Sequence, residues 1–188
     1  MIQANWTGPY AWPTFENINK LNAIPDSSGV YLWTFEYKAG YLIYAAGVTR
    51  RSFKERFREH TQKYMNGEYN VLDIVSVQKG IRKEIWHGWG YAQKHRDEFK
   101  EKRSIIIEAV HKQLMGFRVF VTDIGKKPRI LERLEAAIMN TLYKQPPPIC
   151  NIPDKGMQLA PRWQSEEIIS VKNECPKILL GLPGIIEI

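Results

Sequence analysis

An arginine and a histidine lie one helical turn apart in the segment that follows Ser52. Ser52 and Glu55 have the spacing of a capping box, which predicts that a helix begins here and runs to about Asn66. On that helix Arg56 lies four residues before His60, so the two side chains share a face. A guanidinium can bind a phosphate through two hydrogen bonds, and an imidazole can transfer a proton near neutral pH. The pair suits phosphate chemistry, although a solvated arginine and a core histidine are the simpler explanation of this spacing alone.

A glutamate falls on the apolar side of a second predicted helix, over residues 129–143. The apolar stripe of that helix consists of Leu131, Leu134, Ile138 and Leu142. Glu135 lies within this stripe rather than opposite it. Because burial of an unpaired carboxylate costs free energy, we expect Glu135 to have an arginine, hydrogen-bond donors or a metal ion as partner. A buried salt bridge and a functional role are equally good explanations.

The elements that must position these groups are indicated by hydrophobic patterning. Residues 30–37 and 41–46 are rich in β-branched and aromatic side chains, which predicts a hairpin of two strands. Residues 117–124 alternate between apolar and polar and predict a third strand, and residues 93–115 predict one long charged helix. We therefore expect an α+β fold with a small three-stranded antiparallel sheet flanked by helices. Beyond residue 151 we expect an irregular chain, with short strands near 168–171 and 177–180.

These pieces occur in the order that is typical of the GIY-YIG nuclease family. Gly29-Val30-Tyr31 resembles the first half of the family signature, and Ile43-Tyr44-Ala45-Ala46-Gly47 resembles the second half. The residues that follow in the family's order are Arg56, His60, Glu135 and Asn151. The resemblance covers about residues 25–151, with a helical insertion at about 67–115. It leaves an aromatic N-terminal extension at 1–24 and a C-terminal extension at 152–188, which we expect to pack on the same domain.

The resemblance implies hydrolysis of DNA phosphodiester bonds with one divalent metal ion, Mg²⁺ or Mn²⁺. It implies that Glu135 holds the metal ion and that Arg56 stabilises the charge that develops on the phosphate. It further implies that Tyr31 positions or deprotonates the attacking water and that His60 carries a proton or a hydrogen bond. Asn151 would brace the site through hydrogen bonds.

One position departs from the family pattern. Ala45 stands two residues before Gly47, where the resemblance calls for a tyrosine, and Tyr44 comes one residue early. On a regular strand that offset turns the Tyr44 side chain to the opposite face of the sheet. A β-bulge around Ala45 and Ala46 would return Tyr44 to the site, and we expect this arrangement with Tyr44 as a catalytic residue. The alternative is that the second tyrosine is lost and the site is altered.

Basic residues near these elements are candidates for contact with nucleic acid. Arg50 and Arg51 precede the first helix, and Lys63 lies on it. Lys126, Lys127 and Arg129 form a second basic cluster beside the helix of Glu135. The chain carries a net charge of +7, from 27 Lys+Arg and 20 Asp+Glu, and such an excess favours a polyanionic partner. The insertion interleaves basic residues with tryptophans, which suits nucleic acid or the packing of an accessory subdomain.

The leading hypothesis is a metal-dependent DNA endonuclease of restriction or defence type. The alternative is a nucleic-acid-binding module of similar fold whose catalysis is weak or lost, and a third is a protein-interaction domain that uses the aromatic N-terminal segment. One active site cuts one strand, so double-strand cleavage would require a dimer or sequential nicking. Two cysteines and the lack of an apolar segment long enough for a membrane predict a cytoplasmic location.

Overall fold

The computed structural model describes all 188 residues and has an α+β fold. The helices are α1 (Glu16–Asn19), α2 (Phe53–Met65), α3 (Ile74–Val77), α4 (Trp89–Lys94), α5 (Arg96–Glu101), α6 (Arg103–Gly116) and α7 (Pro128–Tyr143). The strands are β1 (Ile2–Asn5), β2 (Thr7–Ala11), β3 (Gly29–Tyr37), β4 (Gly40–Thr49), β5 (Val71–Leu72), β6 (Glu84–Trp86), β7 (Phe117–Thr122), β8 (Ser170–Glu174), β9 (Leu179–Leu180) and β10 (Ile185–Glu187). No helix is both long and apolar enough to cross a membrane.

The central sheet has five strands in the order β2-β7-β3-β4-β9. The three predicted strands β3, β4 and β7 are neighbours in it, and their pairings are antiparallel. The expectation of three strands was too low, because β2 and β9 add one strand to each edge. Strand β2 contains Gly8 and Pro9, which are residue types typical of turns. An edge strand tolerates proline because the N–H groups on its outer side need no hydrogen bond to a neighbouring strand.

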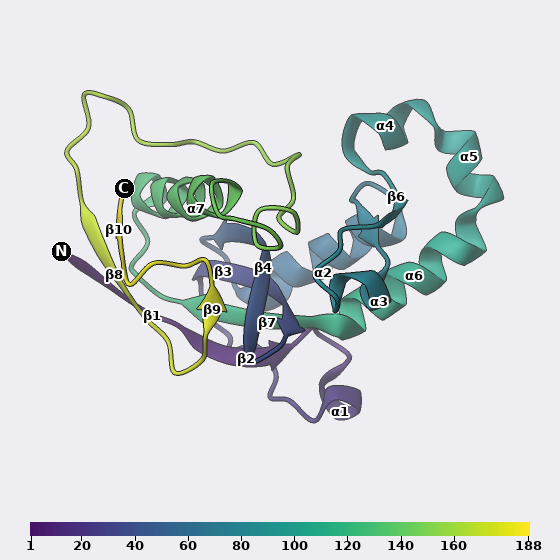
Figure 1. Ribbon diagram of the computed structural model, residues 1–188, viewed down its shortest axis with the longest axis horizontal. Coiled ribbons are helices and arrows are strands. Elements are labelled where there is room, and N and C mark those ends of the chain that lie inside the picture. The colour runs from purple at the N-terminus through teal and green to yellow at the C-terminus, as the bar shows by residue number, and fades with distance from the viewer.

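A second sheet joins the two ends of the chain. It has three strands in the order β1-β8-β10, with β1 parallel and β10 antiparallel to β8. Figure 1 shows the N- and C-termini close together at this sheet. Trp6 follows β1 and Trp12 follows β2, and both rings are buried. The N-terminal segment therefore contributes both strands and core side chains.

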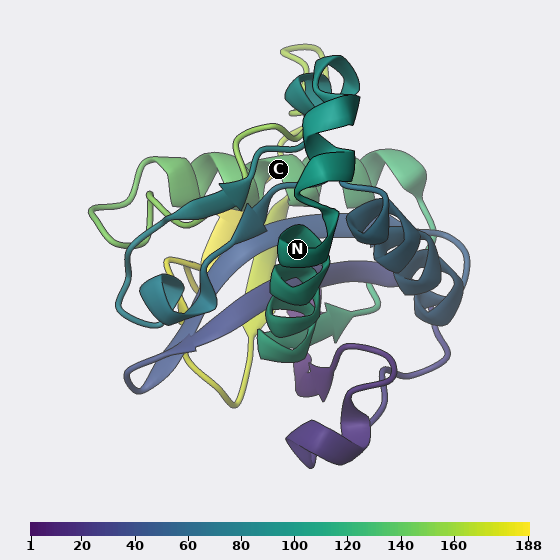
Figure 2. The same ribbon diagram turned by 90° about the vertical axis from the view of Figure 1, so that its right-hand side faces the viewer.

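The central sheet is covered on both faces. Helices α2 and α6 pack on one face, in an aromatic core that includes Trp33, Phe35, Phe57, Tyr64, Val110 and Leu114. Helix α7 packs on the other face, in an aliphatic core that includes Val30, Leu32, Ile43, Leu131, Leu134 and Ile138. Successive residues of β3 thus alternate between the two cores, as side chains of a strand must. Figure 1 shows α7 above the sheet and α2 beside it, and Figure 2 shows α1 and the α4–α5 pair at opposite ends of the molecule.

The helix of Arg56 and the helix of Glu135 are as predicted. The Ser52 side chain accepts a hydrogen bond from the Glu55 backbone N–H at 3.2 Å, and the helix ends at Met65, two residues before Gly67, whose φ is +71°. Its buried residues are Phe53, Phe57, His60 and Tyr64, which are the stripe expected from the spacing. The expected apolar stripe of α7 is also buried.

The predicted single helix over residues 93–115 is instead three helices. The chain leaves helical geometry at His95, where φ is −121° and ψ is 40°, and again after Glu101, the last residue of α5. No proline or glycine marks these breaks. The bend directs Phe99 toward Trp86, with ring centroids 5.4 Å apart, so tertiary packing of one aromatic side chain overrides helix propensity.

Candidate active site

The candidate site is a hollow of about 240 Å³ along the outer edge of β4. Strand β9 pairs with β4 only at Tyr41 and Leu42, which leaves the edge at Ala45, Ala46 and Gly47 without a neighbouring strand. Side chains from both faces of the sheet therefore meet around this edge. The chemically competent residues that line the hollow are Tyr31, Arg56, His60, Lys63, Tyr69, Glu135 and Asp154.

Tyr31 occupies the space that Gly47 leaves open on the neighbouring strand. The two residues are directly paired across β3 and β4. A Cβ atom at position 47 would lie 2.2 Å from the Tyr31 ring and 2.3 Å from its hydroxyl, which no side chain can accept. Gly47 thus makes room for the Tyr31 side chain to reach the hollow.

His60 lies between two tyrosine hydroxyls. Its Nε2 is 2.7 Å from the Tyr31 hydroxyl, and its Nδ1 is 3.0 Å from the hydroxyl of Tyr69. A neutral imidazole has one N–H donor and one acceptor nitrogen, so it can satisfy both hydroxyls at once. Tyr31, His60 and Tyr69 form a continuous hydrogen-bonded chain that begins in the hollow.

Burial keeps the side chains of Tyr31 and His60 uncharged. Burial is the main cause that lowers the pKa of His60 to about 2, and the positive charges of Arg56 and Lys63 lower it further. Burial also raises the pKa of Tyr31 above its usual value, although the adjacent Arg56 guanidinium acts in the opposite direction. At neutral pH His60 is therefore a neutral imidazole, and Tyr31 and Tyr69 are neutral phenols.

Arg56 supplies the positive charge of the hollow. One terminal nitrogen donates a hydrogen bond to Glu59 at 3.1 Å, whereas the buried Nε–H has no partner in the protein. An unpaired buried donor costs free energy unless a ligand satisfies it. The guanidinium is thus fixed by Glu59 at one nitrogen and free to bind an anion at another.

Glu135 reaches the same hollow from α7 and has neither an ion pair nor a hydrogen bond. Burial raises the pKa of its carboxyl to about 7, while the charge of Arg56 lowers it and that of Glu132 raises it. Of the partners that the sequence left open, a buried salt bridge is therefore absent. A carboxylate in such a site gains free energy from a cation that enters the hollow.

The side chains that line the hollow fit Mg²⁺ in a site with one protein carboxylate, that of Glu135. No group of three or more His, Cys, Asp or Glu side chains is arranged to hold a metal ion. Mg²⁺ commonly keeps several waters and takes one or two carboxylates together with the phosphate oxygens of a substrate. The partnerless carboxylate of Glu135 meets that requirement. Asp154 also lines the hollow, but one of its oxygens already accepts hydrogen bonds from Asn70 and from the Gly156 backbone.

Tyr44 does not line the hollow, contrary to expectation. The register between β3 and β4 shifts here, because Trp33 pairs with Ala45 and Thr34 pairs with Ile43, which leaves Tyr44 as the extra residue of a bulge. The bulge places Tyr44 on the same face as Tyr31. Its ring nevertheless lies deeper in the aromatic core, 5.7 Å from the ring of Phe117, and Ala45 lines the hollow instead.

Asn151 is also outside the hollow. Its side chain is exposed, and its only side-chain contact is the Cys150 thiol, which donates to it at 3.5 Å. Five residues separate the run of three prolines from Asp154, which enters the site and whose backbone N–H donates to the Tyr44 carbonyl at 2.8 Å. A brace for β4 exists, but Asp154 provides it in place of Asn151.

The predicted basic residues surround the hollow unevenly. Arg50, Arg51 and Arg56 line a neighbouring hollow of about 460 Å³ at the start of α7, although Arg51 is paired with Glu59 at 2.7 Å. Lys63 lines the candidate site itself. Lys126 and Lys127 are exposed on the loop before α7 and form no ion pair.

Arg129 does not belong to the basic group before α7. It forms an ion pair with Glu166 at 2.5 Å and lies over the ring of Trp163, with 4.5 Å from its guanidinium carbon to the ring centroid. Its N–H groups also donate to the carbonyls of Ala160 and Pro161. Arg129 therefore anchors the C-terminal extension against α7.

Two chemically competent residues of the hollow had no signal in the sequence. Tyr69 and Asp154 lie in segments that connect helices and strands, where no periodicity indicates which way a side chain points. No family model, curated protein or solved structure matches this chain.

Proposed function

We propose that this chain is a metal-dependent DNA endonuclease of the GIY-YIG type. The observation that carries the proposal is Glu135, a largely buried carboxylate without a protein partner that shares one hollow with Arg56 and Tyr31. A structural glutamate would be paired, whereas a metal ligand is left free for its ion. A fold of that family is supported by the antiparallel strands β7, β3 and β4, which α2 covers on one face and α7 on the other.

In the proposed reaction Arg56 binds the scissile phosphate. Its buried Nε–H lacks a partner, and a phosphate oxygen would satisfy it while the guanidinium stabilises the charge of the transition state. A Mg²⁺ ion held by Glu135 would supply Lewis-acid stabilisation of the same phosphate. Glu59 keeps the guanidinium in place through its hydrogen bond to the other nitrogen.

Tyr31, His60 and Tyr69 would move the proton of the attacking water. Tyr31 accepts that proton as it passes its own to Nε2 of His60, and Nδ1–H of His60 passes a proton to the hydroxyl oxygen of Tyr69, which releases its own proton to solvent. Because the pKa of His60 is about 2, a doubly protonated imidazolium is unfavourable. The ring therefore loses a proton from Nδ1 in the same step in which it gains one at Nε2. Tyr69 thereby takes part of the role that the family pattern gives to a second signature tyrosine.

The experiment is a cleavage assay with plasmid and synthetic DNA in Mg²⁺ and in Mn²⁺. We expect wild-type protein to nick or cut DNA, and Glu135→Gln and Arg56→Ala to lose about 100-fold or more of the rate while remaining folded. Glu108→Gln is the matched control, because Glu108 is exposed on α6 and contacts only Lys112. Intact DNA across varied sequences, methylation states and both metal ions would exclude the proposal.

A binding module that does not cut DNA is the second candidate. It is favoured by Ala45, which lines the hollow at the place where the family pattern has a tyrosine. This candidate predicts salt-sensitive binding of DNA without hydrolysis, since Lys and Arg contacts to phosphates release counterions. A cleavage product that depends on Glu135 would exclude it.

A further inference from the structure

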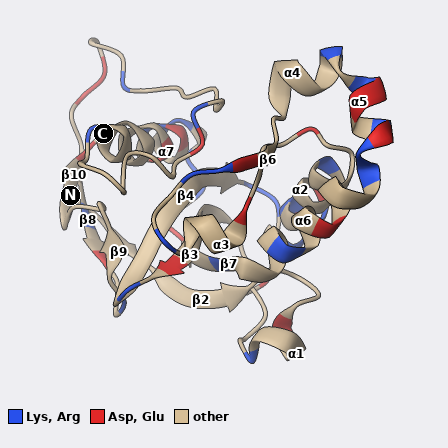
Figure 3. Ribbon diagram, turned by 45° about the vertical axis from the view of Figure 1, so that its right-hand side comes forward, with Lys and Arg blue, Asp and Glu red and all other residues tan.

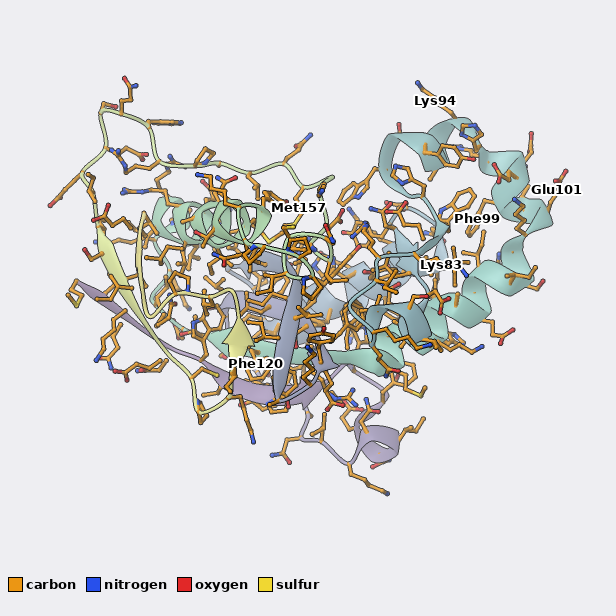
Figure 4. All side chains as sticks on the ribbon, viewed as in Figure 1. Lys83, Lys94, Phe99, Glu101, Phe120 and Met157 are labelled. Atoms are coloured by element: carbon orange, nitrogen blue, oxygen red, sulfur yellow. The ribbon has the colours of Figure 1, made fainter.

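A second hollow, called here the aromatic hollow, lies beside the candidate active site, between the end of α2 and the insertion. Its volume is about 640 Å³. Four of its lining residues are aromatic, namely Tyr69, Trp86, Trp89 and Phe99. Figure 4 shows Phe99 pointing inward from α5, whereas Lys94 and Glu101 point away from the body of the protein.

This aromatic hollow adjoins the site of the proposed reaction. Lys63, Tyr69 and Trp89 line both hollows, so a strand whose phosphate sits against Arg56 would have its neighbouring nucleotide at the entrance of the aromatic hollow. Tyr69 is at the junction, because its hydroxyl contacts His60 in the site while its ring packs against Trp89 at 5.1 Å between centroids.

The walls of the aromatic hollow are fixed by specific contacts. The Trp86 indole N–H donates to the Gly67 carbonyl at 2.6 Å, which ties the insertion to the end of α2. A Cβ atom on Gly67 would lie 2.4 Å from the Phe99 ring, so the glycine allows Phe99 to approach this close. The hollow is therefore a built feature and not a gap between loosely packed helices.

Trp89 has an unusual backbone conformation. Its φ is +53°, in the left-handed region that large side chains rarely adopt because the conformation costs free energy. The ring is thereby held at the junction of the two hollows, and a Cβ atom on Gly156 would lie 2.5 Å from its indole nitrogen. Strain retained at a large aromatic residue in a hollow points to a ligand that stacks on it.

The charges at the rim fit a nucleic acid strand. Lys63 and Arg96 line the aromatic hollow and form no ion pair, and the Lys63 ammonium lies 5.6 Å from the centroid of the Tyr69 ring; Glu68 adds one carboxylate to the lining. Figure 3 shows both signs of charge mixed along α5, so the insertion as a whole is not a simple basic surface. Cations without an ion pair beside aromatic rings are the arrangement that holds a phosphate backbone while a base stacks.

We propose that the aromatic hollow binds an unpaired nucleobase of the DNA strand next to the phosphate to be cut. This inference rests on the proposed function and names its substrate class: DNA that carries an unpaired or displaced nucleotide at the cleavage position. A base inside a duplex cannot reach a hollow of this kind, whereas an unpaired base enters at small cost in lost stacking. The insertion is then the element that selects the structure of the DNA.

The test measures the affinity of the Glu135→Gln protein, which should bind DNA without cutting it. Two duplexes are compared by fluorescence anisotropy at one salt concentration: one with a single bulged nucleotide, and the other with an abasic residue in place of that nucleotide. Because base stacking on aromatic side chains typically changes affinity by about 5- to 150-fold, we expect the bulged base to bind at least about fivefold more tightly.

Variants of the hollow should remove this preference. Phe99→Leu retains apolar volume but loses the aromatic face, and Trp89→Asn suits the left-handed backbone, so both should fold. Either change should bring the ratio of the two affinities close to one. Lys94→Ala is the control, since Lys94 lies on α4 and points away from the hollow.

The outcomes separate this inference from the proposed function. Equal affinity for the bulged base and the abasic bulge, in a protein whose wild type cuts DNA, would overturn the base site and leave the nuclease. Retention of the ratio in both variants would also overturn it. Failure to bind any of the duplexes at low salt would overturn both proposals.

Discussion

Replacement of Glu135 by glutamine should make the protein more stable at alkaline pH while it abolishes cleavage. Burial raises the pKa of this carboxyl from an ordinary value of 4.5 to about 7, with Arg56 lowering it and Glu132 raising it. The difference corresponds to about 3 kcal/mol of unfolding free energy, at about 1.36 kcal/mol per pKa unit. Glutamine carries no charge at any pH and avoids this cost.

The pH dependence follows from the sign of the change. Glu135 binds its proton more tightly in the folded protein than in the unfolded chain. Between pH 4.5 and about pH 7 the folded state therefore holds more protons, and its stability falls as pH rises through this window. Above about pH 7 the full cost is present, and below pH 4.5 it is absent.

The assay is unfolding by urea in the presence of EDTA, at pH 4.5 and at pH 8. We expect Glu135→Gln to unfold close to wild type at pH 4.5 and to be more stable than wild type by up to about 3 kcal/mol at pH 8. Equal differences at the two pH values would refute the account of Glu135 as a buried carboxylate without a partner. A variant that is less stable than wild type at pH 8 would show that the carboxylate has a partner in the protein.

Three further changes test other parts of the site. Gly47→Ala should lower stability by about 1–3 kcal/mol in thermal unfolding, because the new methyl group would overlap Tyr31, whereas Gly184→Ala, in open space, should have little effect. Burial lowers the pKa of His60 to about 2, so its imidazole should show no titration by NMR from pH 8 to pH 4.5. Because the unfolded chain binds this proton with the ordinary pKa of 6.5, His60 should also lower the stability of the protein as pH falls below 6.5. An NMR titration midpoint near pH 6.5 would contradict the burial of this side chain. Lys127→Ala should reduce the salt dependence of DNA binding by about one counterion, and an unchanged slope would remove this exposed lysine from the interface.

Local sequence patterns were sufficient for the elements that carry the site. The Ser52 cap, the stripe of Phe53 and Phe57 and the position of His60 could be predicted because a helix repeats every 3.6 residues, whatever the rest of the fold. The place of Glu135 in the stripe of α7 followed from the same periodicity. Each of these depends only on neighbours within two turns of one helix.

The errors have a different physical origin, in contacts between distant parts of the chain. The bulge in β4 was expected from the spacing around Gly47, but the depth of the Tyr44 ring depends on Phe117, which is remote in sequence. Asn151 and Asp154 follow a proline run whose direction no local pattern specifies. A short strand was expected near 177–180, where β9 lies, but its pairing with β4 and the edge strand β2 are recognisable only from the strands beside them.

The most direct test of the central claim is diffraction from crystals soaked with Mn²⁺ and a short DNA. The account predicts an anomalous peak at about 2.0–2.2 Å from a carboxylate oxygen of Glu135, with a phosphate oxygen between that ion and the Arg56 guanidinium. The same soak of Glu135→Gln crystals should show no peak there. A metal ion bound elsewhere, with the Glu135 carboxylate still free and DNA present, would contradict the account.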